Sequence, residues 1–330
     1  MGGAEPLKHY LIIDGGTTNL RVTLVDQNGV SLAAEKRSIG AAASAAAGNN
    51  LALRAAVGDC MNAIYQSKSL SAFDISGCIA YGMITCASGL LEVPHLCAPA
   101  RLEDFRAGLV SASFDDIAPF PITFIPGLKN FSGEVGLHNV MQMDMMRGEE
   151  TEAIGFAQLM KPQEDYVLLL PGSHNKLISI DKNGRLLGCM TTISGELLSA
   201  LTHHTILTEA VGGSFVQPDT YDRDMMLAGA EACKAGISRA AFSSRILRTL
   251  GGLPQTKVAS FLLGTVLTAD LDALKAFDVT CSRLFVAGKE PLQQALCDLM
   301  NANGYQAIPV DAAVTARIGI TGAMAIAGWL

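Results

Sequence analysis

Residues 10–29 read YLIIDGGTTNLRVTLVDQNG, and they predict short strands joined by tight turns. The apolar run at 10–13 stops at an acid, two glycines and two threonines. Residues 20–25 alternate apolar and polar side chains, as a half-buried strand does. Asn28-Gly29 is a strong hairpin signal, so 30–39 is expected to be the returning strand. The stretch therefore predicts a β-meander.

A second stretch repeats this pattern in the middle of the chain. Residues 166–184 read YVLLLPGSHNKLISIDKNG. Both stretches carry Gly, a hydroxyl residue, one further residue and Asn, as GTTN at 16–19 and GSHN at 172–175. The offset is 156 residues at the start and 155 at the Asn-Gly turn, so one residue was gained or lost. Chance similarity is the alternative, but the matched turns favour two related halves, each opening with a β-meander.

The segments after the first meander are less regular. The Ala-rich stretch 41–48 fits either a helix or a loop, whereas 51–67 has helical periodicity. A strand is expected around 79–81. The chain then enters a long region with many prolines, which predicts irregular structure.

The composition describes a globular chain without a nucleic-acid or membrane signature. Its 330 residues suffice for two domains, and 49% of them are hydrophobic, which allows a sizeable core. The net charge is −7 and no basic cluster appears, which argues against nucleic acid and anionic membrane surfaces as partners. No apolar run is long enough to span a bilayer.

The N-terminus and the cysteines indicate the cytoplasm. The N-terminus, which begins Met1-Gly2-Gly3, lacks the charged segment and apolar core of a signal peptide, so no signal peptide is expected. The eight cysteines include no CxxC pair, so neither a disulfide framework nor a zinc site is expected. Several lie among apolar residues, which is typical of buried thiols in a reducing compartment.

The first turn of each meander is a candidate anion site. Glycines and hydroxyls in a tight turn expose backbone N–H and O–H donors, which suit phosphate, and glycine permits close approach of a ligand. Asp14 can hold a hydrated Mg²⁺ beside such a phosphate. The alternative is that Gly16 and Gly172 are ordinary hairpin glycines. No Walker loop or GxGxxG motif is present, so a P-loop or Rossmann site is not predicted.

Six segments carry a family resemblance: DGGTTNLRV (14–22), YGMI (81–84), IPGL (125–128), MMRGEET (145–151), PGSHNK (171–176) and TISGEL (192–197). Together they resemble the 2-dehydro-3-deoxygalactonokinase family, within the actin/hexokinase/sugar-kinase superfamily, over nearly the whole chain. Three positions depart from the family's pattern. Leu90 or Leu91 stands in place of Trp, His95 in place of Tyr, and Leu177 in place of a second Trp. These positions fall near the expected sugar-acid pocket and the second turn.

The resemblance implies an α/β, two-domain actin-like ATPase (ribonuclease H-like) fold, with duplicated β-meander halves and an interdomain cleft. Residues 1–145 would form an N-terminal domain for the sugar acid and the first phosphate loop, completed by a C-terminal helix at 311–330. Residues 146–310 would form the second domain, with the second phosphate loop and the adenosine pocket. The two loops would grip ATP from opposite domains. The residues assigned to the ATP phosphates are Gly15, Gly16, Thr17, Thr18, Asn19, Gly172, Ser173, His174, Asn175 and Lys176.

A kinase needs a carboxylate to accept the proton of the attacking hydroxyl. In sugar kinases an acid precedes a helix of small residues before the second phosphate loop, and RGEETEAIGFA (147–157) fits that description. Catalysis is assigned to Glu149 as the base, with Glu150 at the helix start, where an acid interacts favourably with the dipole. Both can instead be first-turn capping acids, and Asp144 is a third candidate base. Asp14 completes the catalytic set and would hold Mg²⁺, directly or through water.

The substrate and adenosine sites are assigned by the same resemblance. Arg147 can pair with the substrate carboxylate or with a neighbouring Glu. Glu196 can accept from sugar hydroxyls; the alternative is that Ser194 caps a helix running through His203. His174 can donate to a phosphate or make a structural hydrogen bond. The residues assigned to the substrate are Arg21, Met83, Arg147, Ser194, Gly195 and Glu196, and those assigned to adenosine are Ala287, Gly288 and Lys289.

The expected reaction is phosphorylation of 2-dehydro-3-deoxy-D-galactonate to its 6-phosphate, in galactonate and galactose catabolism. The expected cofactors are ATP and Mg²⁺, and the expected partners are the small-molecule sugar acid and ATP, with no nucleic acid and no membrane. The sequence leaves the oligomeric state open, and a homodimer is one of the assemblies considered. Two alternatives remain: a kinase of another small sugar or sugar acid on the same scaffold, and a catalytically silent nucleotide-binding sensor.

Overall fold

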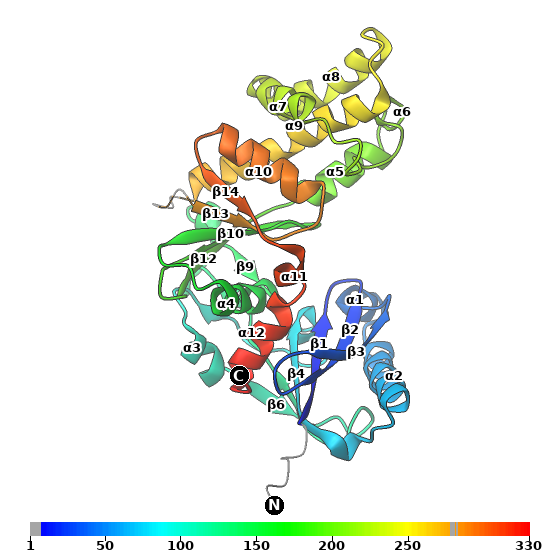
Figure 1. Ribbon diagram of the computed structural model, residues 1–330, viewed down its shortest axis with the longest axis vertical. Coiled ribbons are helices and arrows are strands. Elements are labelled where there is room, and N and C mark those ends of the chain that lie inside the picture. Colours follow the sequence, from blue (N-terminus) through cyan, green and yellow to red (C-terminus); the bar gives the residue numbers. More distant parts are fainter. Residues whose placement is uncertain (1–7, 278–280, 282) are drawn as a thin grey trace, which may run out of the picture. The chain divides into compact units, whose positions relative to one another are not determined.

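The computed structural model describes residues 8–277, 281 and 283–330, and the chain divides into two compact units. Helix α4 (Glu149–Met160) lies in the first unit rather than opening the second, because it packs along α12 (Ile318–Ala327) (Figure 1). The division therefore differs from the expected one at 145/146. Unit one contains the chain up to Pro162, Asn183–Leu187 and Ala316–Leu330; unit two contains Gln163–Lys182 and Gly188–Thr315.

Unit one is built on a six-stranded sheet in the order β3-β2-β1-β4-β7-β6. β1, β2 and β3 form the predicted antiparallel meander, while β4 runs parallel to β1 and β7 parallel to β4. The strands are β1 (His9–Gly15), β2 (Leu20–Asp26), β3 (Ser31–Arg37), β4 (Ile75–Gly82), β6 (Val110–Ala112) and β7 (Ile122–Phe124).

Asp26 closes the hairpin between β2 and β3. Its carboxylate accepts hydrogen bonds from the backbone N–H groups of Asn28 and Val30, each at 2.9 Å. Gly29 has φ of 75°, a conformation that glycine adopts without strain. The Asn-Gly signal thus marks a real turn, and the strand that follows is shorter at both ends than the predicted 30–39.

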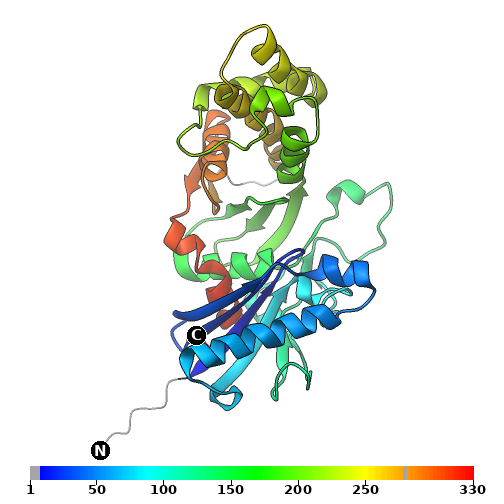
Figure 2. The same ribbon diagram turned by 90° about the vertical axis from the view of Figure 1, so that its right-hand side faces the viewer.

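Helix α2 (Leu51–Lys68) covers one face of this sheet (Figure 2). Its Leu53, Val57 and Met61 pack with Leu11 and Ile13 of β1 in a continuous apolar core. The Ala-rich segment is helical, as α1 (Ala41–Ala47). The proline-rich region carries short elements. Besides β6 and β7 of the main sheet, they include β5 (Leu96–Cys97), α3 (Leu102–Ala107), β8 (Leu128–Lys129) and β9 (Met145–Met146), and the strands β5, β8 and β9 form a small separate sheet.

The opposite face carries α4 and α12, which cross through glycines. A Cβ built on Gly155 would lie 1.8 Å from the carbonyl oxygen of Ile318, and one on Gly322 would lie 1.8 Å from that of Thr151. Only glycine allows two helix backbones to approach so closely. The single helix expected near the C-terminus is divided into α11 (Ala312–Thr315) in unit two and α12 in unit one.

Unit two repeats the strand order of unit one, as β12-β11-β10-β13-β14. β10 and β11 are antiparallel, β13 is parallel to β10, and β14 is parallel to β13. The predicted duplication is therefore confirmed, and it extends over five strands in each half. The strands are β10 (Tyr166–Leu170), β11 (Asn175–Ile180), β12 (Leu186–Thr192), β13 (Arg283–Val286) and β14 (Gln306–Pro309).

The helices of unit two pack around α9 (Gln255–Ala276), whose Leu262 and Leu267 share an apolar core with Leu169 and Val286 of the sheet. The others are α5 (Ser194–His203), α6 (Thr208–Val211), α7 (Arg223–Ala232), α8 (Ile237–Thr249) and α10 (Leu292–Ala302). Within the described part of the chain, no helix combines the length and apolar character needed to cross a membrane.

Candidate active site

The first glycine turn, residues 15–19, joins β1 to β2 and rests on the start of α1. The N–H of Gly16 donates to the carbonyl of Asn19 at 2.8 Å, which closes the turn through its own backbone. The carbonyls of Gly16 and Thr17 accept from the first two N–H groups of α1 at 3.2 and 3.0 Å. The side chains of Thr17, Thr18 and Asn19 are exposed, so their polar groups are open to a ligand.

The second glycine turn, residues 171–175, rests on α5 in the same way. The carbonyl of Ser173 accepts from the N–H of Glu196 at 3.0 Å. A Cβ built on Gly195 would lie 2.0 Å from the carbonyl oxygen of Gly172, just as one on Gly40 would lie 2.3 Å from that of Gly16. Each turn thus needs a glycine at the helix beneath it. This second pair of equivalent glycines, 155 residues apart, went unnoticed in the sequence.

The two asparagines that looked equivalent in sequence are not equivalent in structure. Asp14 pairs with Arg21 across the first hairpin, whereas Leu170 pairs with Lys176 across the second, so the one-residue difference lies inside the turn. Asn19 therefore remains exposed in the first turn. Asn175 begins β11 and is buried, and its Oδ1 accepts from the N–H of Gly172 at 3.0 Å. Asn175 shapes the turn from inside.

Of the other residues predicted around the second turn, His174 and Glu196 are exposed and paired, with Nε2 and Oε1 3.0 Å apart. Lys176 is buried in β11, and its Nζ donates to the hydroxyl of Thr191. Ser194 does not cap α5, because the cap position is Ile193 and makes no side-chain bond. The Ser194 hydroxyl instead lies 2.9 Å from that of Thr192.

Asp14 lies in a row of polar side chains across the sheet of unit one. The strand register places Arg21 of β2 and Tyr81 of β4 directly beside it, and side chains in register point to the same face. That face is the one covered by α4 and α12: a Cβ on Gly319 would lie 2.4 Å from the Tyr81 hydroxyl. The start of α4 therefore meets Asp14.

Helix α4 brings three glutamates to this row. Gly148, with φ of 119°, makes the sharp entry into the helix, and its N–H donates to both carboxylate oxygens of Glu150 at 2.8 Å. Glu150 is fully buried and turns back to the helix start. Glu149 and Glu152 are three residues apart, so they share one face of the helix. Glu152 was missed in the sequence, although this spacing could have identified it.

The carboxylates raise one another's pKa. Burial raises the pKa of Asp14, the charge of Arg21 opposes this, and the charge of Glu149 adds to it. Burial and the Glu149 charge raise the pKa of Glu150 to about 7. Burial, followed by the charges of Asp14 and Glu149, raises the pKa of Glu152 to about 8. Such clustering of raised pKa values is typical of catalytic acid groups.

Arg147 is engaged within the protein. Its Nη1 donates to the carbonyl and the hydroxyl of Thr85 at 2.7 and 2.8 Å, and its Nη2 donates to the carbonyl of Val93 at 2.7 Å. Nη2 also lies 3.3 Å from Nδ1 of His95. Arg147 therefore ties the segment after β4, which includes Met83, to the start of α4. Asp144 lies before this point, and its carboxylate accepts from the N–H of Met145 at 2.7 Å.

A cavity of about 540 Å³ adjoins the second glycine turn within unit two. Gly172, Ser173, Gly195 and Glu196 form its polar side. Its remaining lining includes the apolar Leu198, Phe215, Val216, Leu263 and Leu292, together with Gln217 and Glu290. A cavity with an apolar wall and a donor-rich edge suits a planar base joined to a phosphate chain.

The predicted adenosine residues lie beside this cavity. Ala287 follows β13, and its N–H donates to the carbonyl of Leu169 at 2.9 Å. A Cβ on Gly288 would lie 2.3 Å from Cγ of Pro171, so this glycine lets the strand end pass close to the second turn. Gly288 and Lys289 line a separate cavity of about 580 Å³ that shares Glu290 with the first.

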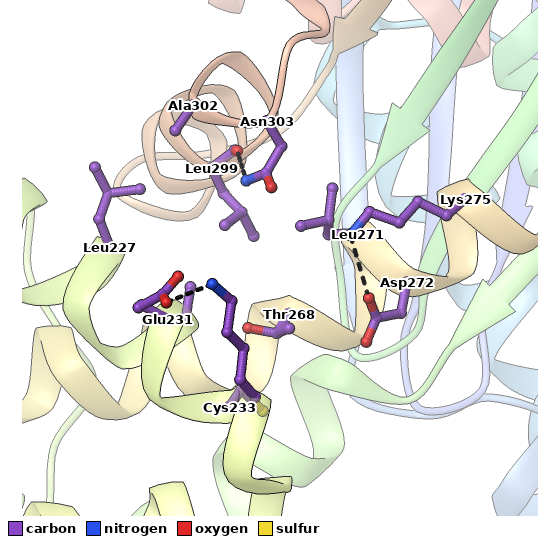
Figure 3. A pocket seen from close by; sticks show the side chains of 12 residues that line it. Leu227, Glu231, Cys233, Thr268, Leu271, Asp272, Lys275, Leu299, Ala302 and Asn303 are labelled. Atoms are coloured by element: carbon purple, nitrogen blue, oxygen red, sulfur yellow. Dashed lines mark hydrogen bonds and ion pairs between the residues drawn. The ribbon is translucent and has the colours of Figure 1, made fainter.

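A third cavity of unit two, of about 670 Å³, is lined by α7, α9 and α10 (Figure 3). It contains none of the residues predicted for ATP or substrate. Its charged side chains pair with residues three positions along the chain, Glu231 with Lys234 and Asp272 with Lys275. We therefore place no part of the candidate site there.

Few side chains in the described part of the chain could bind a metal ion together. Within the described ranges, no three His, Cys, Asp or Glu side chains are arranged to hold a metal ion. Mg²⁺ keeps several waters and takes one or two protein carboxylates together with phosphate oxygens. Asp14, with the charge of Glu149 nearby, fits this kind of site.

The family model and two relatives that match this chain carry the name of one enzyme. The family model for 2-keto-3-deoxy-galactonokinase matches residues 14–323. A Rhizobium meliloti (strain 1021) protein named "probable 2-dehydro-3-deoxygalactonokinase" is 24% identical over 325 residues, 96% of each chain. The 2-dehydro-3-deoxygalactonokinase of Escherichia coli (strain K12) is 30% identical over 201 residues, which are 59% of this chain and 60% of that one.

Solved structures share the fold. A crystal structure from Sinorhizobium meliloti, assigned as a 2-dehydro-3-deoxygalactonokinase, has a TM-score of 0.75 at 23% identity and covers 96% of this chain and 98% of that one. Component A of the (R)-2-hydroxyglutaryl-CoA dehydratase from Acidaminococcus fermentans has a TM-score of 0.51 at 10% identity, over 96% of each chain. The fold is the predicted α/β fold of actin-like ATPases and sugar kinases. Since the family model spans nearly all of the sequence from Asp14 onward, the chain belongs to the 2-keto-3-deoxy-galactonokinase family.

Proposed function

We propose that this chain transfers the γ-phosphoryl group of ATP to the 6-hydroxyl of 2-dehydro-3-deoxy-D-galactonate, giving the 6-phosphate and ADP in galactonate catabolism. Membership of the family and the names of its relatives support this reaction. The observation that carries the proposal is the group of carboxylates around Asp14, beside the first glycine turn, because a kinase must accept a proton from the attacking hydroxyl.

In this proposal the second glycine turn binds the phosphates of ATP. Its exposed Ser173 offers an O–H donor, and the backbone of Gly172 permits close approach, whereas His174 would first have to leave Glu196. The adenosine enters the 540 Å³ cavity, with Phe215 and Leu292 on its apolar wall. Glu196 lines the same cavity, so we assign it to the nucleotide side rather than to the sugar acid. Lys176 is buried and bonded to Thr191, so its role is to support β11.

Glu149 is the base in this proposal. Glu149 is the first residue of α4 and is partly exposed, so a substrate hydroxyl can reach it, whereas Glu150 is fully buried and Glu152 lies one turn further into the helix. Glu150 is also bonded to the N–H of Gly148, so it serves the helix start. As the hydroxyl oxygen attacks the γ-phosphorus, its proton passes to Glu149 and the bond from phosphorus to the ADP oxygen breaks. Mg²⁺ held with ATP at Asp14 would neutralise phosphate charge.

Arg21 is the better candidate for the substrate carboxylate. It is exposed and lies beside Asp14 on the neighbouring strand, so it can face a ligand at the acid group. Arg147 would first have to give up its bonds to Thr85 and Val93. We therefore assign Arg147 to positioning the acid helix, and Arg21 to charge recognition.

The departures from the family pattern do not point to a different substrate. Leu90 or Leu91 stands in place of the first Trp; Leu90 is 6% exposed, and both leucines pack in the apolar core shared by β1 and α2. Leu177 is fully buried in the core of unit two. Both replace a large aromatic by another apolar core residue. Only His95, which contacts Arg147, lies next to the candidate site.

The test is ADP release by the purified chain with ATP, Mg²⁺ and a panel of 2-keto-3-deoxy sugar acids. Turnover of 2-dehydro-3-deoxygalactonate well above that of its epimers supports the proposal. Turnover confined to other sugars would replace it by the broader sugar-kinase alternative. ADP binding in calorimetry without any turnover would instead support the sensor. Glu149→Gln serves as the matched variant, because it removes the base while keeping the nucleotide side intact.

A further inference from the structure

Asp270 is a buried carboxylate that the reaction above does not use. It lies within α9, the central helix of unit two, and is 0% exposed. Its Oδ2 accepts from Nδ2 of Asn175 at 3.1 Å, and its Oδ1 accepts from the hydroxyl of Thr192. The hydroxyl of Ser194 also bonds to it. These three partners are an amide and two hydroxyls rather than a cation.

The partners of Asp270 frame the second glycine turn. Asn175 ends the turn, and its Oδ1 holds the N–H of Gly172. Thr192 ends β12, and Ser194 begins α5, on which the turn rests. One carboxylate thus connects the turn, the strand end and the supporting helix. The Nδ2 of Asn175 donates to Asp270, and its Oδ1 accepts from the N–H of Gly172. Asp270 therefore also fixes which way this side-chain amide points.

The first glycine turn shows why this matters. It closes through its own backbone, from the N–H of Gly16 to the carbonyl of Asn19. The second turn is one residue shorter and closes through a side chain, so its shape depends on what orients Asn175. An ionisable group without a cation is costly to bury, and such groups are kept where a fully bonded polar network fixes one geometry.

We propose that Asp270 is a positioning residue for the nucleotide: by orienting Asn175, it sets the backbone of residues 171–174 in the shape that receives the ATP phosphates. This inference rests on the proposed placement of ATP at the second turn. It predicts an effect on the nucleotide and none on the sugar acid, because the polar contacts of Asp270 all lie within unit two.

The test compares Asp270→Asn with Asp272→Asn in the full-length enzyme. Asn at 270 keeps the shape but has one acceptor oxygen instead of two, so it cannot accept from both the Asn175 amide and the Thr192 hydroxyl as the carboxylate does. Asp272 lies two residues along the same helix, is exposed and pairs with Lys275 at the cavity in Figure 3, so it controls for the charge change. We expect Asp270→Asn to raise the KM for ATP and the Kd for ADP by about tenfold or more. The KM for the sugar acid should stay within about twofold, and Asp272→Asn should match wild type in all three.

Two further variants keep the inference testable if Asp270→Asn folds poorly. Thr192→Val removes one of the bonds to Asp270 and should raise the KM for ATP by a smaller factor. Asn175→Ala should raise the KM for ATP by about as much as Asp270→Asn does. In the double variant the rise in KM should be smaller than the product of the two single rises, because Asp270 acts through Asn175.

The outcomes separate the inference from the function on which it rests. Wild-type protein that phosphorylates the sugar acid, with Asp270→Asn unchanged in ADP affinity, overturns the role of Asp270 alone. Equal rises in both KM values, with a lower melting temperature, would show a general structural role and also overturn it. Wild-type protein that does not bind ADP would remove the proposed nucleotide placement itself.

Discussion

Replacing Gly322 by alanine tests whether the packing of α12 on α4 positions the carboxylates. A Cβ at this position would lie 1.8 Å from the carbonyl oxygen of Thr151 and 3.0 Å from the N atom of Gly155. Both contacts are with backbone, so no change of rotamer relieves them. The two helices must therefore separate by roughly 1 Å, and α4 carries Glu149 and Glu152 away from Asp14.

The expected size of the effect follows from two opposing terms. Overpacking costs roughly 1–3 kcal/mol, and a backbone clash belongs at the upper end. Alanine recovers about 1 kcal/mol of helix propensity over glycine. The net loss is about 2 kcal/mol, which lowers the melting temperature of a unit of this size by about 4–8 °C. A displacement of about 1 Å at the reacting groups lowers kcat by roughly 100-fold.

Urea unfolding and steady-state kcat measure the two effects. Gly58→Ala is the matched control, because it lies inside α2 with its nearest neighbour 3.8 Å from the new Cβ. This control should gain about 0.5–1 kcal/mol and keep its kcat. Gly322→Ala with wild-type stability and turnover would show that the carboxylates do not depend on this helix crossing.

Three further predictions concern single side chains. Glu149→Gln should lower kcat by roughly 10²–10⁴ while calorimetry finds ADP affinity within about twofold of wild type; unchanged turnover would move the base to another acid. His95→Gln should remove an acid-sensitive part of the stability. Burial, followed by the charges of Arg147 and Lys129, lowers the pKa of His95 from 6.5 to about 4, so between these values the unfolded chain binds a proton that the folded chain does not. Stability in urea should therefore fall by roughly 1–2 kcal/mol as the pH drops from 7.5 to 4.5 in wild type, and the same fall in His95→Gln would contradict this. Arg147→Lys should lose about 2 kcal/mol in urea unfolding, because an ammonium cannot replace a fork bonded to Thr85 and Val93; wild-type stability would show that these bonds contribute little.

The elements that the sequence predicts well are those set by neighbouring residues. The apolar run before Asp14, the alternation at 20–25 and the Asn28-Gly29 turn are local signals, and each appears in the structure where it was expected. The glycine turns are also local, because backbone donors in a tight turn depend on only a few residues. The acid at the start of α4 was predictable for the same reason.

Partners distant in the chain could not be predicted. The sequence favours a substrate carboxylate or a neighbouring Glu as the partner of Arg147, but its bonds reach Thr85, 62 residues away. Asn175 was assigned to phosphate, yet its amide reaches Asp270, 95 residues away. The chain passes from unit one to unit two after Pro162 and not at the predicted boundary 145/146, because the Gly155–Gly322 contact holds α4 in unit one. None of these pairings leaves a periodic or compositional signal.

The two halves keep one backbone frame and differ in the side chains placed on it. Gly40 and Gly195 support the two turns, and Gly82 and Gly288 sit where the next strand ends beside them. On this frame, the hairpin pair Asp14 and Arg21 of unit one corresponds to Leu170 and Lys176 of unit two, and that lysine is buried. At these two hairpin positions, an acid beside an exposed arginine is therefore found in only one copy. In the other copy the same positions hold a buried leucine and a buried lysine bonded to Thr191, and an apolar cavity adjoins the turn. In the proposed reaction, duplication followed by this division would let two similar halves serve the acceptor and the nucleotide separately.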